Sequence, residues 1–345
     1  MLSMFVQMYK MSDKIMDEII IDIKDLKTYY LTDDGAVKAV DKINLKIEKG
    51  KTLGLVGESG CGKSTVALSI LKLLNWPGKI VGGKILFCGE NLVEKTDEKM
   101  RRIRGKEISI IFQDPTASLN PVFTIQDQLS EVLKLHKHLD DEETRKNVID
   151  MLRKVRISDP ERRLSHYPHE FSGGMKQRIM IAMALLCQPK LLIADEPTTS
   201  LDVTIQAQIL ELIKELKEVY GSSILIITHN LGVIAELSDM TAVMYAGKIV
   251  ECSDTLTLFE KPIHPYTIAL LRSIPRVDIE QKTIKGIYGF VPSLINPPSG
   301  CRFHPRCKCA IEKCQKEEPL YEEVMEGHQV ACFRAREIID GKIFP

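Results

Sequence analysis

Residues 52–65 read TLGLVGESGCGKST, a stretch in which an apolar segment runs directly into a glycine-rich one. Its first residues, 52–56, are apolar or small and predict a buried β-strand, while residues 66–74 carry a helix-like pattern. The loop between them has the spacing G-x-x-x-x-G-K-S, in the strand, loop and helix order that a phosphate-binding loop requires. The sequence therefore predicts an α/β protein with a nucleotide phosphate site.

The chemistry of this loop follows from its residue types. Glycines let the backbone fold tightly around phosphate oxygens, and the amides and the helix start supply partial positive charge. We expect Lys63 to neutralise the β- and γ-phosphates and Ser64 to ligate Mg²⁺. The loop residues expected to contact the nucleotide are Gly57, Ser59, Gly60, Cys61, Gly62, Lys63, Ser64 and Thr65.

A second apolar strand, residues 191–194, ends in the carboxylates of Asp195 and Glu196. A carboxylate at the carboxyl end of a buried parallel strand reaches the nucleotide crevice, where Asp195 can hold Mg²⁺ through its water shell. Because side chains alternate along a strand, Glu196 is expected to point elsewhere and to polarise the attacking water.

The size and charge of the chain restrict its class. Its 345 residues favour two domains, and Lys plus Arg and Asp plus Glu both number 47, so no basic excess indicates a nucleic-acid partner. The longest apolar run, residues 179–187, is about half as long as a bilayer crossing needs, and no secretion signal is present. We expect a cytoplasmic protein without a membrane span, and a frayed extension over residues 1–17.

A third motif selects among nucleotide-binding families. Residues 171–175 read Phe-Ser-Gly-Gly-Met, ahead of an expected helix at 179–186. This segment resembles the Leu-Ser-Gly-Gly-Gln signature of ABC ATPases. The resemblance implies a head-to-tail ATPase dimer that sandwiches ATP, in which Ser172, Gly173 and Gly174 bind the γ-phosphate on the partner's loop.

Other residues follow in the order of the family. They are Gln113 after the apolar strand 108–112, Asp202 in Ser-Leu-Asp at 200–202, and His229 after the strand 224–227. By resemblance, Gln113 reaches Mg²⁺ or the attacking water and senses the permease. Asp202 signals across the dimer, and His229 contacts the γ-phosphate and orients the catalytic carboxylate.

An aromatic side chain ahead of the first core strand is expected to stack on adenine. Tyr30 keeps the spacing of the family, and Tyr29 is the alternative.

Between Gln113 and Phe171 the apolar spacing becomes helical. The expected fold is an α/β P-loop (RecA-like) core with an antiparallel β subdomain, an inserted α-helical subdomain and a small Cys-rich C-terminal extension. The resemblance implies an ABC ATPase domain at 18–260, with the helical subdomain at about 115–172, and a C-terminal domain at 261–345. The stretch 114–122 is expected to act as a hinge.

The C-terminal residues narrow the resemblance. His-Pro-Tyr-Thr at 264–267 and PPSGCRFHPRC at 297–307 look like the tail of oligopeptide and dipeptide importer ATPases, a group that includes nickel importers. Most signatures carry Gln at the position of Met175. With Met there, the segment 171–175 is similar to the signature of the first of the two ATPase subunits in this group. The resemblance implies a heterodimer with a second ATPase, two transmembrane permease subunits, an extracytoplasmic peptide-binding protein, and a peripheral position on the cytoplasmic membrane face.

Five of the nine cysteines lie in the last 45 residues, and such clustering indicates a metal rather than disulfides in a cytosolic chain. Four thiolates suit an Fe–S cluster or tetrahedral zinc. The resemblance favours a [4Fe–4S] cluster, with zinc second and free thiols third. It implies as ligands Cys301, Cys307, Cys314 and Cys332, with Cys309 additional.

The predicted reaction is Mg²⁺-dependent hydrolysis of ATP, coupled to import of dipeptides or oligopeptides. A nickel or other small-solute importer of the same family is the alternative, because separate subunits select the solute. A soluble ABC ATPase of DNA repair or translation is a remote alternative, disfavoured by the single cassette and the neutral charge. An Fe–S redox enzyme ranks last, since no second cofactor motif is present.

Overall fold

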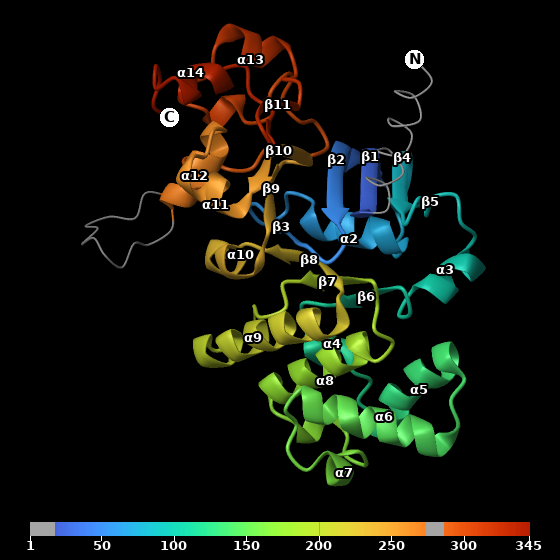
Figure 1. The fold of residues 1–345 in the computed structure, drawn as a ribbon. Helices are drawn as coiled ribbons and strands as arrows, with labels where there is room; N and C mark the ends of the chain where they lie inside the picture. The colour runs from blue at the N-terminus through green and yellow to red at the C-terminus, as the bar shows by residue number, and fades with distance from the viewer. Residues whose placement is uncertain (1–17, 200, 274–285) are drawn as a thin grey trace, which may run out of the picture. The chain divides into compact units, whose positions relative to one another are not determined.

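The computed structural model describes residues 18–199, 201–273 and 286–345. The predicted extension at 1–17 lies outside the described residues. The chain forms two compact units (Figure 1). The P-loop unit comprises Met1–Ile47, Thr52–Val93 and Ile227–Pro345, and the helical unit comprises Glu48–Lys51 and Glu94–Ile226.

An antiparallel sheet in the P-loop unit has the strand order β2-β1-β4-β5. The strands are β1 (Ile19–Thr32), β2 (Gly35–Glu48), β4 (Gly78–Phe87) and β5 (Glu90–Asn91). In the β1–β4 pair, Ile23 lies opposite Ile85, and both side chains are buried, which gives this sheet an apolar face. This is the β subdomain that the sequence predicts.

The P-loop unit holds five strands of an eight-stranded sheet, in the order β11-β12-β10-β9-β3. The strands are β3 (Thr52–Val56), β9 (Met240–Tyr245), β10 (Lys248–Asp254), β11 (Glu322–Met325) and β12 (His328–Val330). Strand β3 is parallel to β9, whereas β12 is antiparallel to β10. The C-terminal tail therefore extends a sheet of the nucleotide-binding core.

Helices and short 3-10 turns complete the P-loop unit. They are α2 (Lys63–Leu71), α10 (Leu231–Leu237), α11 (Thr255–Glu260), α12 (Pro265–Arg272), η2 (His304–Arg306), α13 (Glu312–Lys316) and α14 (Ala335–Ile339). The helix expected at 66–74 begins three residues earlier, directly after the glycine-rich loop. It ends at Leu71 because Lys72 takes the left-handed conformation with φ 51°.

The helical unit contains strands in the order β8-β7-β6, of which β7 and β6 are parallel. They are β6 (Ile108–Ile111), β7 (Leu191–Asp195) and β8 (Ser223–Thr228), of which β8 spans the boundary of the two units. The buried pairs of β6 and β7 include Ile108 opposite Leu191. Continuous apolar runs predicted these strands, because a parallel sheet is covered on both faces.

The helical unit also contains helices, and those between residues 115 and 172 lie where the inserted subdomain is expected. The helices of the unit are α3 (Asp97–Ile103), α4 (Pro115–Ser118), α5 (Ile125–Lys137), α6 (Asp141–Lys154), α7 (Pro160–Arg163), η1 (Pro168–Glu170), α8 (Gly173–Leu185) and α9 (Val203–Tyr220). Helix α8 begins six residues before the expected 179, because Ser172 caps it. The stretch expected to be a hinge, 114–122, contains the short helix α4, capped by Asp114.

Candidate active site

The phosphate-binding loop needs glycine for two different reasons. A Cβ on Gly57 would lie 2.1 Å from the carbonyl oxygen of Met244, and a Cβ on Gly62 would lie 2.0 Å from that of Ala39. At Gly60 nothing lies within 4 Å, but φ is +77°, which L-residues rarely adopt. The loop therefore packs directly against neighbouring backbone at Gly57 and Gly62. At Gly60 the backbone conformation is what favours glycine.

Lys63 is the first residue of α2 and is only 6% exposed. Its Nζ donates hydrogen bonds to the carbonyl oxygens of Gly57, at 2.7 Å, and Glu58, at 3.0 Å. Its Nζ also lies 3.7 Å from Sγ of Cys61, and burial raises the pKa of that thiol. The ammonium group is thus held against the loop that the sequence assigns to the phosphates.

The carboxylate that the sequence predicts to be catalytic, that of Glu196, lies in the helical unit. Two donors point at one oxygen of Glu196: Nε2 of Gln113 lies 3.1 Å and Oγ1 of Thr199 lies 2.8 Å from its Oε2. The sequence predicted Gln113 near this chemistry, but Thr199 was missed, because a Thr in a polar turn carries no motif. The two hydrogen bonds fix the direction of the carboxylate.

The prediction that alternation along a strand directs the Glu196 side chain is wrong. Alternation along a strand does not apply to it, because β7 ends at Asp195. Glu196 instead has φ 48°, so a left-handed turn after the strand sets the direction of its side chain. Asp195 is 9% exposed at the carboxyl end of β7, where a Mg²⁺ ligand is expected.

The signature residues begin helix α8. Oγ of Ser172 accepts a hydrogen bond from the amide of Met175 at 3.4 Å. A Cβ on Gly174 would lie 2.9 Å from Cγ2 of Ile205, so the helix start packs closely on α9. Nε2 of Gln177 donates to the carbonyl oxygen of Pro197 at 2.6 Å, which ties α8 to the segment after Glu196. Gln177 was also missed by sequence reasoning.

The structure describes two further residues that the resemblance assigns to the site, Asp202 and His229. Asp202 caps α9 by accepting from the amide of Ile205 at 3.0 Å, while Ser200 lies outside the described residues. His229 is exposed directly after β8, in the P-loop unit. Its predicted action on Glu196, which belongs to the helical unit, stays a prediction.

The two candidate adenine contacts differ in their surroundings. The Tyr30 ring packs against the backbone of Gly78, where a Cβ would lie 2.7 Å from its Cε1. The Tyr29 hydroxyl donates to Oδ1 of Asp41 at 2.8 Å. Burial, with this hydrogen bond, raises the pKa of Tyr29 to about 12. Tyr29 is thus engaged within the β subdomain, which favours Tyr30 for a stacking role.

The tail cysteines gather around one small cavity of about 10 Å³. Its lining includes Cys301, Cys307, Cys309, Cys314 and Cys332. Burial raises the pKa of Cys301 and Cys307 to about 11 and that of Cys332 to about 12.

The arrangement of these thiols is not that of a metal site. Within 18–199, 201–273 and 286–345, no group of three or more His, Cys, Asp or Glu side chains is placed to hold a metal ion. The donor type fits an Fe–S cluster or zinc. The cavity, however, leaves no room for a cluster between the side chains as they stand.

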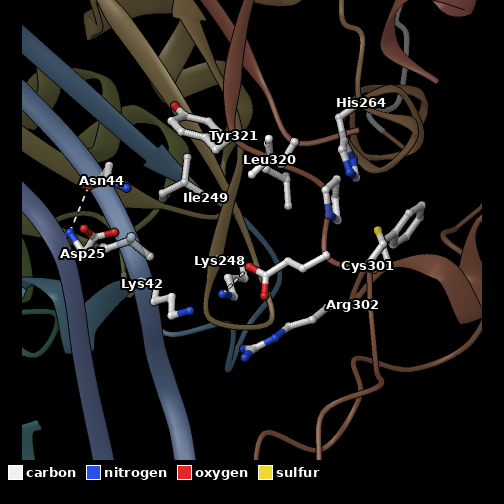
Figure 2. A pocket seen from close by; sticks show the side chains of 17 residues that line it. Asp25, Lys42, Asn44, Lys248, Ile249, His264, Cys301, Arg302, Leu320 and Tyr321 are labelled. Carbon is white, nitrogen blue, oxygen red and sulfur yellow. Dashed lines mark hydrogen bonds and ion pairs between the residues drawn. The ribbon is translucent and has the colours of Figure 1, made fainter. Parts of the chain in front are cut away.

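A larger cavity, of about 410 Å³, lies between β2, β10 and the tail. Figure 2 shows Lys42 and Asn44 on one side of it, Lys248 on β10, and Cys301 and Arg302 from the tail. Two of its cationic side chains are paired within the protein: Nζ of Lys248 lies 2.5 Å from Oε1 of Glu318, and Arg302 pairs with Asp41.

Comparison with known proteins identifies the family. Residues 40–199 match the ABC transporter family, and residues 250–314 match the family described as oligopeptide/dipeptide transporter, C-terminal region. A probable peptide ABC transporter ATP-binding protein, y4tR of Sinorhizobium fredii, is 49% identical over 94% of this chain and 97% of its own length. The oligopeptide transport ATP-binding protein OppD of Escherichia coli is 46% identical over 92% of this chain and 94% of its own length.

The chain belongs to the ATP-binding subunits of oligopeptide and dipeptide ABC transporters. Its predicted ATPase activity, coupled to transport, is confirmed at the level of this family. Permease subunits and a substrate-binding protein are the partners that membership implies. No helix in the described part of the chain is long and apolar enough to cross a membrane.

Solved structures confirm the predicted ABC ATPase fold. A dimeric ATP-binding cassette in a post-hydrolysis state, bound to ADP and phosphate, matches with a TM-score of 0.62 at 26% identity, over 68% of this chain and 98% of that chain. The protein cbiO1 of Clostridium perfringens, part of an ABC transporter complex, matches with a TM-score of 0.60 at 28% identity, over 71% of this chain and 92% of that chain.

Proposed function

We propose that this ATPase drives the import of dipeptides or oligopeptides across the cell membrane. The named functions of its relatives support the solute class, and the match of residues 250–314 supports the transporter type. The observation that carries the hydrolytic role is the Glu196 carboxylate, which Gln113 and Thr199 hold in one direction.

In the proposed reaction, Glu196 accepts a proton from water while the water oxygen attacks the γ-phosphorus of ATP. The bond from that phosphorus to the bridging oxygen breaks, and its electron pair leaves with ADP. Lys63 offsets charge on the β- and γ-phosphates. Ser64, Gln113 and Asp195 supply oxygen donors, which Mg²⁺ prefers, and the bound ion would neutralise phosphate charge.

The import role is tested by reconstitution of the chain with its second ATPase, permease subunits and peptide-binding protein in liposomes. Uptake of a labelled dipeptide or oligopeptide is expected to require internal ATP and to stop with Lys63→Ala. ATP-dependent uptake of Ni²⁺ without peptide uptake would replace the peptide assignment with the nickel alternative.

We further propose that the chain works as the first ATPase of a heterodimer on the cytoplasmic membrane face. Ser172, Gly173 and Gly174 would bind the γ-phosphate on the partner's loop, and Asp202 would signal across the dimer. Met175 cannot donate a hydrogen bond as Gln can, so the site completed by this signature is expected to be the weaker one. The test mutates the phosphate-binding lysine of one subunit at a time, Lys63 in this chain or its equivalent in the partner, and measures ATP turnover. Equal turnover rates of the two single mutants would contradict the asymmetry.

We propose that the tail cysteines Cys301, Cys307, Cys314 and Cys332 bind a [4Fe–4S] cluster, which would staple the tail. Because the present cavity is small, binding requires the thiols to move apart. Anaerobic purification is expected to give about four irons and four acid-labile sulfides per chain. Stoichiometric zinc, or no metal, would contradict the cluster, and loss of metal in Cys309→Ser but not in Cys332→Ser would contradict the ligand set.

A further inference from the structure

Glu58, the second residue of the phosphate-binding loop, is held by side chains from the C-terminal part of the chain. The amide of Glu58 donates to the hydroxyl of Tyr266 at 2.9 Å. Its carboxylate receives two hydrogen bonds from Arg306, at 2.7 Å from Nη1 to Oε2 and 3.1 Å from Nη2 to Oε1. Its carbonyl oxygen is also one of the two that hold Nζ of Lys63. One loop residue thus joins the tail to the phosphate-binding lysine.

Arg306 is itself fixed in direction. Its Nε donates to the carbonyl oxygen of Tyr288 at 2.8 Å, and its Nη2 donates to that of Gly289 at 3.2 Å. Its guanidinium lies 5.8 Å from the ring centroid of Tyr245, and the side chain is only 6% exposed. A guanidinium held in this way offers a rigid fork that matches a carboxylate in bidentate geometry. The position of the Glu58 carboxylate therefore follows the position of the tail.

Tyr266 is equally constrained. Its ring is fully buried and packs on Tyr245 and Phe303, with centroid distances of 4.6 and 5.4 Å. Its amide donates to Nδ1 of His264 at 3.0 Å. Burial lowers the pKa of His264 to about 4, so the ring is neutral near pH 7 and Nδ1 can accept this bond.

Other contacts dock the tail without touching the loop. Arg302 pairs with Asp41, and Nζ of Lys248 lies 2.5 Å from Glu318 (Figure 2 shows both cationic side chains). Nε2 of His328 lies 2.7 Å from Oε1 of Glu251, and both side chains are fully buried. Because the tail has these anchors, the pair of Arg306 and Glu58 is not needed merely to attach it.

We propose that Arg306 is a positioning residue for ATP binding: it fixes Glu58, and through Glu58 the entry to the phosphate-binding loop and Lys63. Loss of Arg306 would leave the carboxylate free to rotate and the loop free to sample other shapes. ATP would then have to order the loop on binding, which weakens affinity without changing the reacting groups. The inference rests on the proposed role of residues 57–65 in binding ATP.

The test compares variants of the full-length protein by equilibrium binding of Mg²⁺-ATP and by ATPase kinetics with its partner subunits. Arg306→Met and Glu58→Gln are each expected to raise the Kd for ATP about tenfold, with kcat at saturating ATP unchanged. The double variant is expected to be no weaker than either single one, because both remove the same contact. Arg306→Lys should be intermediate, since an ammonium cannot make the bidentate pair.

Arg302→Met is the matched control, because Arg302 is a buried tail arginine whose carboxylate partner, Asp41, lies outside the loop. It is expected to lower the melting temperature while leaving the Kd for ATP within about twofold. An unchanged Kd in Arg306→Met, or an equal rise in Arg302→Met, would overturn the proposal. If Arg306→Met fails to fold, Glu58→Gln decides in the same way. ATP binding retained by Lys63→Ala would instead refute the loop assignment itself.

Discussion

At the scale of single residues, the phosphate-binding loop is specified by contacts that leave no room for a side chain. Gly62 has φ +109°, and its Cα faces the carbonyl oxygen of Ala39 so closely that a Cβ would lie 2.0 Å from that oxygen. Gly60 differs, because its φ of +77° is its only restriction. Substituting each glycine in turn therefore distinguishes the effect of a steric clash, at Gly62, from the effect of backbone conformation alone, at Gly60.

Gly62→Ala is expected to abolish measurable ATP binding, because loop backbone must shift to admit the methyl group. Gly60→Ala meets no neighbouring atom, so it should cost about 1 kcal/mol of stability, the usual penalty for an L-residue in the left-handed region, and weaken ATP binding less than Gly62→Ala does. Titration with Mg²⁺-ATP and thermal melting measure both effects. Equal ATP affinity in the two variants would contradict the steric account.

The spacing of motifs predicted Gln113 near the same chemistry as Glu196, and the two side chains are in contact, but the direction of Glu196 could not be predicted. The turn that sets the direction of the Glu196 side chain depends on φ 48° at Glu196 itself. This value is unusual for a residue other than glycine, and no local sequence pattern predicts it. Thr199 was missed for a related reason, since its partner is defined only once that turn is formed. Motif spacing thus predicts which side chains belong to the candidate site, while the turn after β7 sets the direction of Glu196 and its contact with Thr199.

At the scale of elements, buried parallel strands were the most predictable feature. Residues 52–56 form β3 with the predicted bounds, because a strand covered on both faces is continuously apolar. Helix starts were less predictable where polar or glycine residues form the first turn, as at Ser172 and Gly173 in α8. The tail strands β11 and β12 were not predicted, because both are short and β12 pairs with β10 far away in sequence, while β11 pairs only with β12.

At the scale of the whole molecule, two matched segments of the family meet in the P-loop unit. Residues 40–199 contain the phosphate-binding loop, and residues 250–314 contain Tyr266 and Arg306. Glu58 and Arg306 are separated by 248 positions, so no sequence window could reveal their pair. The tail is therefore recognisable by more than its cysteines, because it contacts the loop that is predicted to bind phosphate.

The proposed role of Glu196 as the catalytic base is best tested by measuring ATP turnover of Glu196→Gln in the assembled transporter. Turnover is expected to fall by about a hundredfold or more, because amide nitrogen and oxygen cannot accept the proton, while ATP stays bound in a closed dimer. Glu218→Gln, an exposed carboxylate on α9, should leave the rate unchanged. If Glu196→Gln and Glu218→Gln both turn over ATP at the rate of the unmodified protein, Glu196 is not the catalytic base.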